Sequence, residues 1–173
     1  MDAVRSCAAQ SLYICWSAQA ALWRHYRIPK HALPEKAFGV FRQQVLEPSP
    51  LLDGLGTHFP VPVSRHTEVH ESDLPPNLHV LARSARSGLC LRADEDKRTT
   101  YMFNHLEYDV GTLVREYERD RMAGKATNRP GCDHGLETPG TWLPSARRFF
   151  GNWLTSAAAV REERCPLAGP LVG

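Results

Sequence analysis

The stretch "SLYICWSAQAALWRHY", residues 11–26, decides which fold the chain can adopt. Its apolar start, residues 12–15, predicts a buried strand, and the helical spacing of apolar residues in 18–26 predicts a helix directly after it. The small residues Ser17 and Ala18 allow the turn between the two to close. A strand that turns tightly into a helix at a cysteine is typical of a nucleophile elbow, which lifts a reactive side chain out of the sheet.

Cys15, the cysteine at this turn, is therefore a candidate nucleophile. The positive end of the helix dipole favours a thiolate there near neutral pH. The backbone N–H of Trp16 would point toward an oxyanion that forms at Cys15. The alternative is that Cys15 is an apolar residue that ends a buried strand, since free cysteines are usually buried.

The segment "MFNHLEYD", residues 102–109, supplies a base and an acid for such a nucleophile. Side chains two positions apart in an extended segment point the same way, so His105 and Glu107 would share one face at the end of a strand. The imidazole would take a proton from Cys15, and the carboxylate would hold the resulting imidazolium. A His-x-Glu pair alone is weak evidence, because the chain has eight histidines and most are expected to be solvated or capping residues.

The composition is that of a soluble globular protein of about one domain, with 173 residues, 42% hydrophobic and 23% charged. The net charge of +2 is too small to indicate binding to nucleic acid or to a membrane surface. No apolar run approaches a membrane span or a signal peptide, so a cytoplasmic protein is predicted. The five cysteines include no CxxC pair, which disfavours a disulfide scaffold and a structural zinc site.

The rest of the chain predicts more strands than helices. Apolar patterns predict strands in 37–46, 78–84, 88–94 and 99–105, and helices in 109–124 and from about Ser145 onward. Residues 27–36 and 125–140 are predicted loops, and residues 58–69, extended but broken by prolines, are predicted to form an edge strand or a binding loop. This pattern predicts an α/β sheet domain.

Several longer motifs make the chain similar to a known family. They are, in order, "ICWSAQAAL", "IPKHALPEKAFGVF", "SRHTEV", "HLEYDVGTLVREYERD" and "NWL". From about Ser11 to about Leu154 the chain resembles the homoserine O-acyltransferases of the homoserine O-succinyltransferase type, which act in methionine synthesis. The resemblance implies a fold like that of the class I glutamine amidotransferases, a flavodoxin-like α/β sheet with flanking helices.

The resemblance also implies roles for the residues of the elbow and the His-x-Glu pair. Cys15 matches the nucleophile that takes an acyl group from acyl-coenzyme A. His105 matches the general base, and Glu107 matches the acid that accompanies it. The acyl group would then pass from the thioester to the hydroxyl of homoserine. Acyl-coenzyme A is a co-substrate in this scheme, and neither a cofactor nor a metal is implied.

Three further positions match substrate-binding residues of the family: Lys36 in "PEK", Ser64 in "SRHTEV" and Arg119 in "EYERD". A guanidinium such as that of Arg119 suits the carboxylate of an amino acid, because it can bind both oxygens. Without the resemblance, Lys36 would be a solvated loop residue and Arg119 an ordinary charge on a helix surface. Homoserine and acyl-coenzyme A are the expected partners, and a homodimer is left open.

The chain also departs from the family pattern. Ser17 stands where the family usually has glycine after "CW", and about the first two-fifths of the family's chain has no counterpart. Residues 1–160 are therefore expected to form the C-terminal portion of the catalytic domain, with a sheet that is incomplete at the N-terminus. Residues 161–173 are expected to form a flexible tail.

Two other functions stay open at this point. One is a glutaminase or another cysteine hydrolase on the same fold, although "SRHTEV" and "EYERD" have no purpose in a glutaminase. The other is a truncated, non-catalytic paralogue that acts as a binding or structural remnant. The sequence does not distinguish a succinyl from an acetyl donor, or homoserine from serine as the acceptor.

Overall fold

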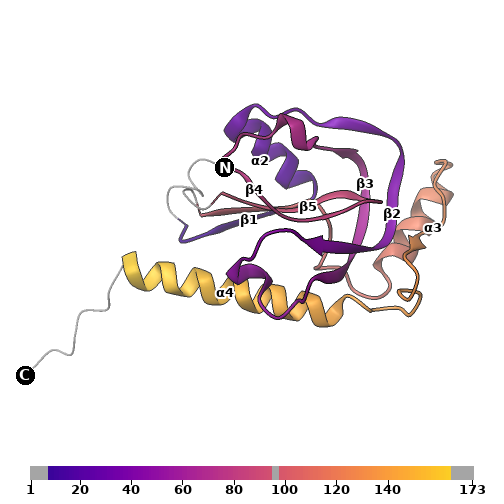
Figure 1. Cartoon of the computed structure of the whole chain (residues 1–173). Helices are drawn as coiled ribbons and strands as arrows, with labels where there is room; N and C mark the ends of the chain where they lie inside the picture. The colour runs from indigo at the N-terminus through magenta and orange to yellow at the C-terminus, as the bar shows by residue number, and fades with distance from the viewer. Residues whose placement is uncertain (1–7, 95–97, 165–173) are drawn as a thin grey trace, which may run out of the picture.

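The computed structural model describes residues 8–94 and 98–164, with side chains as far as residue 160 (Figure 1). The strands are β1 (Ser11–Ile14), β2 (His31–Val45), β3 (His58–Glu68), β4 (His79–Ser84), β5 (Gly88–Asp94), β6 (Thr99–Met102) and β7 (Gly131–Cys132). The helices are α2 (Trp16–Tyr26), α3 (Thr112–Met122) and α4 (Leu143–Arg164), with short 3-10 turns η1 (Pro50–Leu52) and η2 (Glu71–Asp73). No helix within the described residues is long and apolar enough to cross a membrane.

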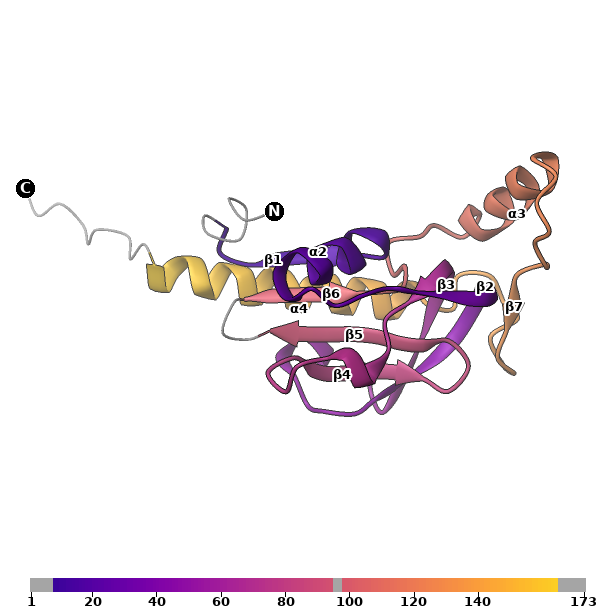
Figure 2. The same cartoon turned by 90° about the horizontal axis from the view of Figure 1, so that it is seen from above.

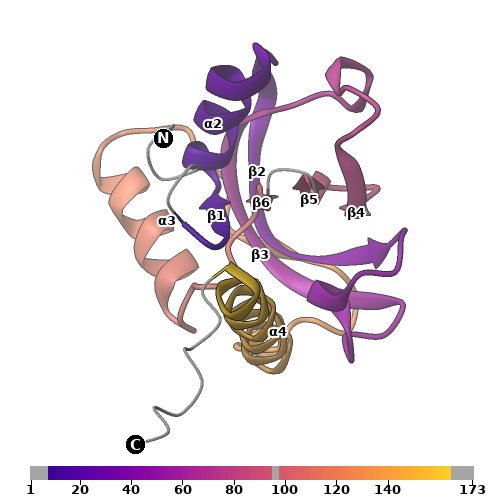
Figure 3. The ribbon, with the colours of Figure 1, turned by 90° about the vertical axis from the view of Figure 1, so that its left-hand side faces the viewer.

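The seven strands form one sheet in the order β1-β6-β5-β4-β2-β3, with β7 paired to β2. β1 and β6 run parallel, with Ser11 opposite Thr99, whereas β6, β5, β4, β2 and β3 form antiparallel pairs. Helices α2 and α4 lie on opposite sides of the strands (Figures 1 and 3), and α3 stands beyond one end of the sheet (Figure 2).

The two faces of the sheet have separate apolar cores. Neighbouring residues of β6 point to opposite faces, so Tyr101 packs in the cluster with Leu22 of α2, and Met102 packs in the cluster with Phe149 of α4. All four of these side chains are fully buried. Burial on both faces explains why the strands in 78–105 are apolar with little alternation.

Most of the predicted elements are confirmed. The strand and helix of residues 11–26 are present, and α3 and α4 begin within a few residues of their predicted starts. The strand predicted in 99–105 ends at Met102, and the predicted loop in 125–140 contains the two-residue strand β7. Helix α4 continues to Arg164, so the first part of the predicted tail is helical, and residues 165–173 lie outside the described residues.

The prediction of a loop in 27–36 is wrong over its second half. β2 begins at His31, which pairs with Glu68 of β3. The register between β2 and β3 shifts between Ala32 and Ala37, and this irregularity contains Pro34, which has no backbone N–H to give to a ladder. The prolines of β3 are tolerated because β3 is the last strand in the order, which confirms the predicted edge strand.

The other end of the order is β1, the strand that ends directly before Cys15. Within the described residues β1 pairs only with β6, so its second side has no neighbouring strand. A parallel strand with an apolar sequence is normally paired on both sides. This unpaired side is the structural counterpart of the sheet that was expected to be incomplete.

Candidate active site

Cys15 lies in a strained turn between β1 and α2. Its backbone adopts φ 51° and ψ −115°, a conformation that costs a non-glycine residue about 1–3 kcal/mol. Its N–H donates to the Met102 carbonyl at 2.7 Å, which extends the pairing of β1 with β6 by one residue. The Ser17 hydroxyl donates to the Ile14 carbonyl at 2.7 Å and accepts from the Ile14 N–H at 2.9 Å. Ser17 therefore closes the elbow with its side chain.

His105 and Glu107 lie in the turn that follows β6. The Nδ1 atom of His105 is 2.6 Å from Oε1 of Glu107, so the carboxylate contacts the ring directly. The backbone N–H of His105 donates to the Pro62 carbonyl at 2.8 Å, which fixes the turn against β3. The two side chains meet because the chain turns here, and not because they share a face of an extended strand.

The electrostatics of His105 connect it with the candidate nucleophile. Burial lowers the pKa of the ring, but hydrogen bonds to the Cys15 thiol and to Glu107 outweigh it and raise the pKa to about 9. The thiol of Cys15 also lies 3.9 Å from the Ser64 carbonyl oxygen. The structure thus brings Cys15, His105 and Glu107 into one group.

Trp16 is the first residue of α2, where the backbone N–H groups of the first turn have no acceptor within the helix. The residue is 67% exposed, so it contributes little to the core. Cys90 differs from Cys15 in its burial. It lies within β5, fully buried, and burial raises the pKa of its thiol to about 12.

A second group of polar residues surrounds Lys36 of β2. The Lys36 ammonium lies 2.9 Å from Oδ2 of Asp120 and 3.9 Å from Oε2 of Glu116, both on α3. It also lies 3.7 Å from the centre of the Phe38 ring. The Lys36 side chain is only 6% exposed, so it is not the solvated loop lysine of the alternative interpretation.

Glu116 joins this group to His105 by way of Tyr108. Its two carboxylate oxygens accept hydrogen bonds from the Ser64 hydroxyl at 2.5 Å and from the Tyr108 hydroxyl at 2.7 Å. The Tyr108 ring stacks on the ring of His105, with centroids 4.1 Å apart. Burial, followed by the hydrogen bond to Glu116, raises the pKa of Tyr108. A continuous set of contacts therefore runs from His105 through Tyr108 and Glu116 to Ser64.

Arg119 reaches the same group through Asp120. Its guanidinium nitrogens lie 3.1 and 3.3 Å from Oδ1 of Asp120, while its side chain stays 63% exposed. Asp120 itself is buried, and the hydrogen bond from Lys36, with a further one from Arg119, lowers the pKa of its carboxyl. Lys36, Ser64 and Arg119 are therefore brought together by two carboxylates.

Those carboxylates were not predicted from the sequence. Arg119 and Asp120 follow Glu116 by three and four positions, which places the three residues on one face of a helix. That spacing was visible in "EYERD". The importance of that spacing could not be predicted, because this face of α3 meets Lys36 and Ser64 only when β2 and β3 bring those residues beside the helix.

The fold is that of the class I glutamine amidotransferases. A protein from Thermoplasma acidophilum that is described as a GMP synthase subunit matches with a TM-score of 0.63 at 17% identity, over 90% of this chain and 60% of that one. A glutamine amidotransferase from Thermotoga maritima matches with a TM-score of 0.54 at 14% identity, over 88% of this chain and 60% of that one. At these identities the likeness shows the fold alone.

The sequence comparisons identify the family. A family model described as homoserine O-succinyltransferase matches residues 1–162. Proteins named homoserine O-acetyltransferase are 48% identical in Novosphingobium aromaticivorans, over 84% of this chain, and 42% identical in Rhizobium rhizogenes, over 83% of it. The chain belongs to the homoserine O-succinyltransferase family. It spans about half the length of these relatives, 50% and 49% respectively.

Proposed function

We propose that this chain carries the nucleophile, base and acceptor-binding groups of a homoserine O-acyltransferase. The observation that supports this most is the position of Cys15. It lies in a strained elbow beside the His105–Glu107 pair, and its sulfur is 3.9 Å from the backbone of Ser64, whose hydroxyl belongs to the Lys36 group. A nucleophile and a set of charged groups suited to an amino acid are therefore adjacent.

The first half-reaction forms a thioester on the chain. The Cys15 sulfur attacks the carbonyl carbon of acyl-coenzyme A, and the protonated His105 ring gives its proton to the departing coenzyme A sulfur. Glu107 holds the ring through Nδ1, which leaves Nε2 free to exchange protons with sulfur or oxygen. The backbone N–H of Trp16 stabilises the oxyanion, and no cofactor or metal takes part.

The second half-reaction transfers the acyl group. His105 takes the proton from the homoserine hydroxyl, the hydroxyl oxygen attacks the thioester carbon, and the C–S bond breaks to return Cys15. Arg119 and Lys36 bind the carboxylate of homoserine, and Ser64 with Glu116 binds its amino group. Arg119 is 63% exposed, whereas Lys36 is 6% exposed and pairs with Asp120 at 2.9 Å, so the carboxylate of homoserine would compete with Asp120 for Lys36.

Mass spectrometry of the intact chain tests the proposal. Incubation with acetyl- or succinyl-coenzyme A should add one acyl group to Cys15, and homoserine should remove it. Acetyl-coenzyme A is the first donor to test, because the relatives are named acetyltransferases. Cys15→Ala should abolish the adduct, and Cys90→Ala is the matched control. A label that glutamine forms and homoserine does not discharge would instead indicate a glutaminase.

The unpaired side of β1 supports the proposal that further polypeptide binds to this chain. α2, the helix that follows β1, exposes 67% of Trp16 and 53% of Trp23, so apolar surface lies close to an unpaired strand. We propose that residues 1–160 work with additional polypeptide that covers this edge, either further family sequence or a second copy, in the cytoplasm. The test compares this chain with a protein of the relatives' length. The longer protein should acylate homoserine at least 10²-fold faster, because the covering polypeptide is proposed to add a second oxyanion donor to the N–H of Trp16.

A further inference from the structure

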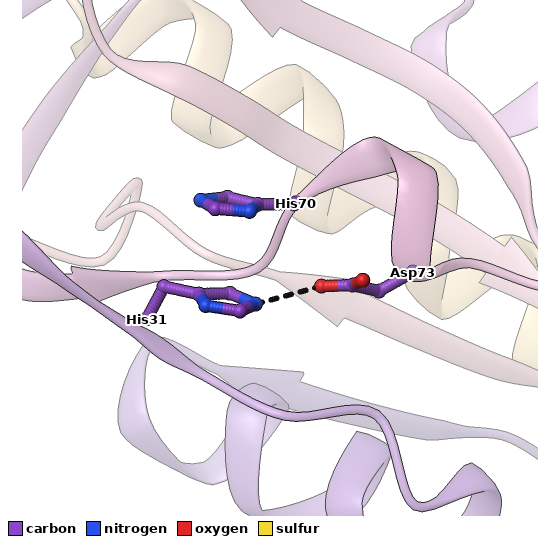
Figure 4. Close-up of side chains that lie close together, drawn as sticks. All are labelled: His31, His70 and Asp73. Atoms are coloured by element: carbon purple, nitrogen blue, oxygen red, sulfur yellow. Dashed lines mark hydrogen bonds and ion pairs between the residues drawn. The ribbon is translucent and has the colours of Figure 1, made fainter.

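Two histidines and an aspartate converge where β2 begins and β3 ends (Figure 4). The Nε2 atom of His31 lies 2.7 Å from Oδ2 of Asp73. The His70 ring stacks on that of His31, with centroids 3.8 Å apart and the planes inclined by 4°. One ligand atom from each of the three residues lies within 4.8 Å of the others.

The backbone places these side chains independently of their mutual contacts. His31 is opposite Glu68 at the end of the β2–β3 ladder. The chain then turns through η2, where the Asp73 N–H donates to the His70 carbonyl at 3.1 Å. Two segments about forty positions apart are therefore fixed side by side, which gives a metal ion a rigid base to bind.

Carboxylates lie beside the two histidines of the cluster. Oε1 of Glu68 lies 3.5 Å from Nε2 of His70, and Asp73 supplies a second carboxylate. The three side chains stay partly exposed, at 37% for His31, 47% for His70 and 28% for Asp73. A cation can therefore enter from solvent.

We propose that His31, His70 and Asp73 bind a divalent transition-metal ion such as Zn²⁺. Imidazole nitrogens and a carboxylate oxygen are ligands that Zn²⁺ prefers, and three protein ligands leave a fourth position for water. Mg²⁺ and Ca²⁺ prefer all-oxygen sites and should not bind. The site is separate from the proposed acyl transfer, in which none of its three residues takes part.

Binding requires a defined rearrangement. The lone pair of an imidazole nitrogen lies in the ring plane, so two parallel stacked rings cannot direct nitrogens at one ion. The exposed His70 ring must turn out of the stack, and the 2.7 Å hydrogen bond between Nε2 of His31 and Asp73 must open to admit the ion. Only neutral imidazoles bind metal, so the affinity should fall at low pH as the histidines take up protons. The bound ion would then tie the start of β2 to η2.

The experiment titrates ZnCl₂ into the whole chain carrying Cys15→Ala, which removes the thiol of the proposed active site as a competing zinc ligand. Calorimetry should give one ion per chain. At 100 times the dissociation constant, the thermal midpoint should rise by about 5 °C or more. The His31 and His70 ring signals should shift in the NMR spectrum, and MgCl₂ should produce neither effect.

Two variants and a control decide the assignment. His70→Ala and Asp73→Asn should each weaken zinc binding at least tenfold. His79→Ala is the matched control, because His79 also contacts a carboxylate, that of Glu47 at 3.1 Å, and should change nothing. His70 is exposed, so its removal should leave the fold intact, as circular dichroism can check. Absence of zinc binding, or equal binding by all variants, overturns the proposal.

Discussion

The reacting half of the candidate site, Cys15 with His105 and Glu107, is held by the backbone. The elbow and the turn after β6 place these side chains, and the Cys15 and His105 N–H groups bond to backbone carbonyls of other strands. The binding half is held by charge. Its members are Lys36, Ser64, Glu116, Arg119 and Asp120, joined by hydrogen bonds and ion pairs. Changes in the first half should remove chemistry and leave the fold, whereas changes to buried charges in the second should lower stability.

The largest expected difference is between the alkylation rates of the thiols of Cys15 and Cys90. Iodoacetamide at neutral pH should label Cys15 completely before it labels Cys90, because burial raises the pKa of Cys90 to about 12 and excludes the reagent. Peptide mapping at several reaction times measures this. Cys132, which is partly exposed and outside the site, is the comparison for accessibility alone. Labelling of Cys90 before Cys15 in the folded chain would exclude the elbow as the source of the nucleophile.

The loss of His105 should have the next largest effect. In the form of the protein that turns over, His105→Ala should lower the rate of acyl transfer by on the order of 10²–10⁴ because the proton acceptor is gone. Stopped assays with mass detection of the thioester give the rate. His58→Ala changes an exposed histidine elsewhere and should leave the rate unaffected. An equal loss in both variants would exclude the proposed role.

Substitution of Lys36, the central cation of the binding half, should lower the free energy of unfolding. Lys36→Met removes the 2.9 Å partner of the buried Asp120 carboxylate, which keeps Arg119 at 3.1 Å and Lys125 at 3.6 Å. The cost should therefore be only part of the about 3–5 kcal/mol that leaving a buried charge unpaired requires. Urea unfolding measures the free energy, and the exposed Lys30→Met is the control. Because Lys36 lowers the pKa of Asp120, this contribution is present above about pH 4 and is lost on further acidification. A Lys36→Met chain as stable as the native one would contradict the charge-held description.

The difference between residues placed by local backbone structure and residues placed by distant contacts also explains what the sequence could predict. The elbow, the strands of 78–102 and the two later helices follow from local apolar patterns, and so they were predicted. The start of β2 at His31 was not, because Pro34 indicates a loop unless the pairing with β3 is known to shift around it. In the site, Cys15 and His105 are recognisable from short motifs. Glu116 and Asp120 gain their meaning only from contacts with β2 and β3, which lie more than fifty positions away.

A smaller effect is expected on the pKa of His105, and measuring it in two variants separates the contributions of Cys15 and Glu107. NMR titration should give a pKa of about 9, with lower values in Cys15→Ala, which removes a hydrogen bond, and in Glu107→Gln, which removes the negative charge beside the ring. A raised pKa means that folding stabilises the protonated ring. This stabilisation is complete below the unfolded value of about 6.5 and disappears as the pH rises through about 9. A pKa that stays the same in Cys15→Ala would show that the thiol does not contact the ring.

The smallest change should come from Arg119, the exposed member of the binding half. Arg119→Lys keeps the charge and loses the planar fork, so the KM for homoserine should rise by about tenfold while thioester formation on Cys15 continues at its native rate. Stability should change little, because the ion pair with Asp120 lies at a side chain that is 63% exposed. The matched control is Arg115→Lys on the same helix, whose side chain is 62% exposed and pairs with Asp109 at 2.7 Å. If Arg119→Lys slowed both half-reactions equally, the residue would belong to the reacting half, and the division of the site into two parts would be wrong.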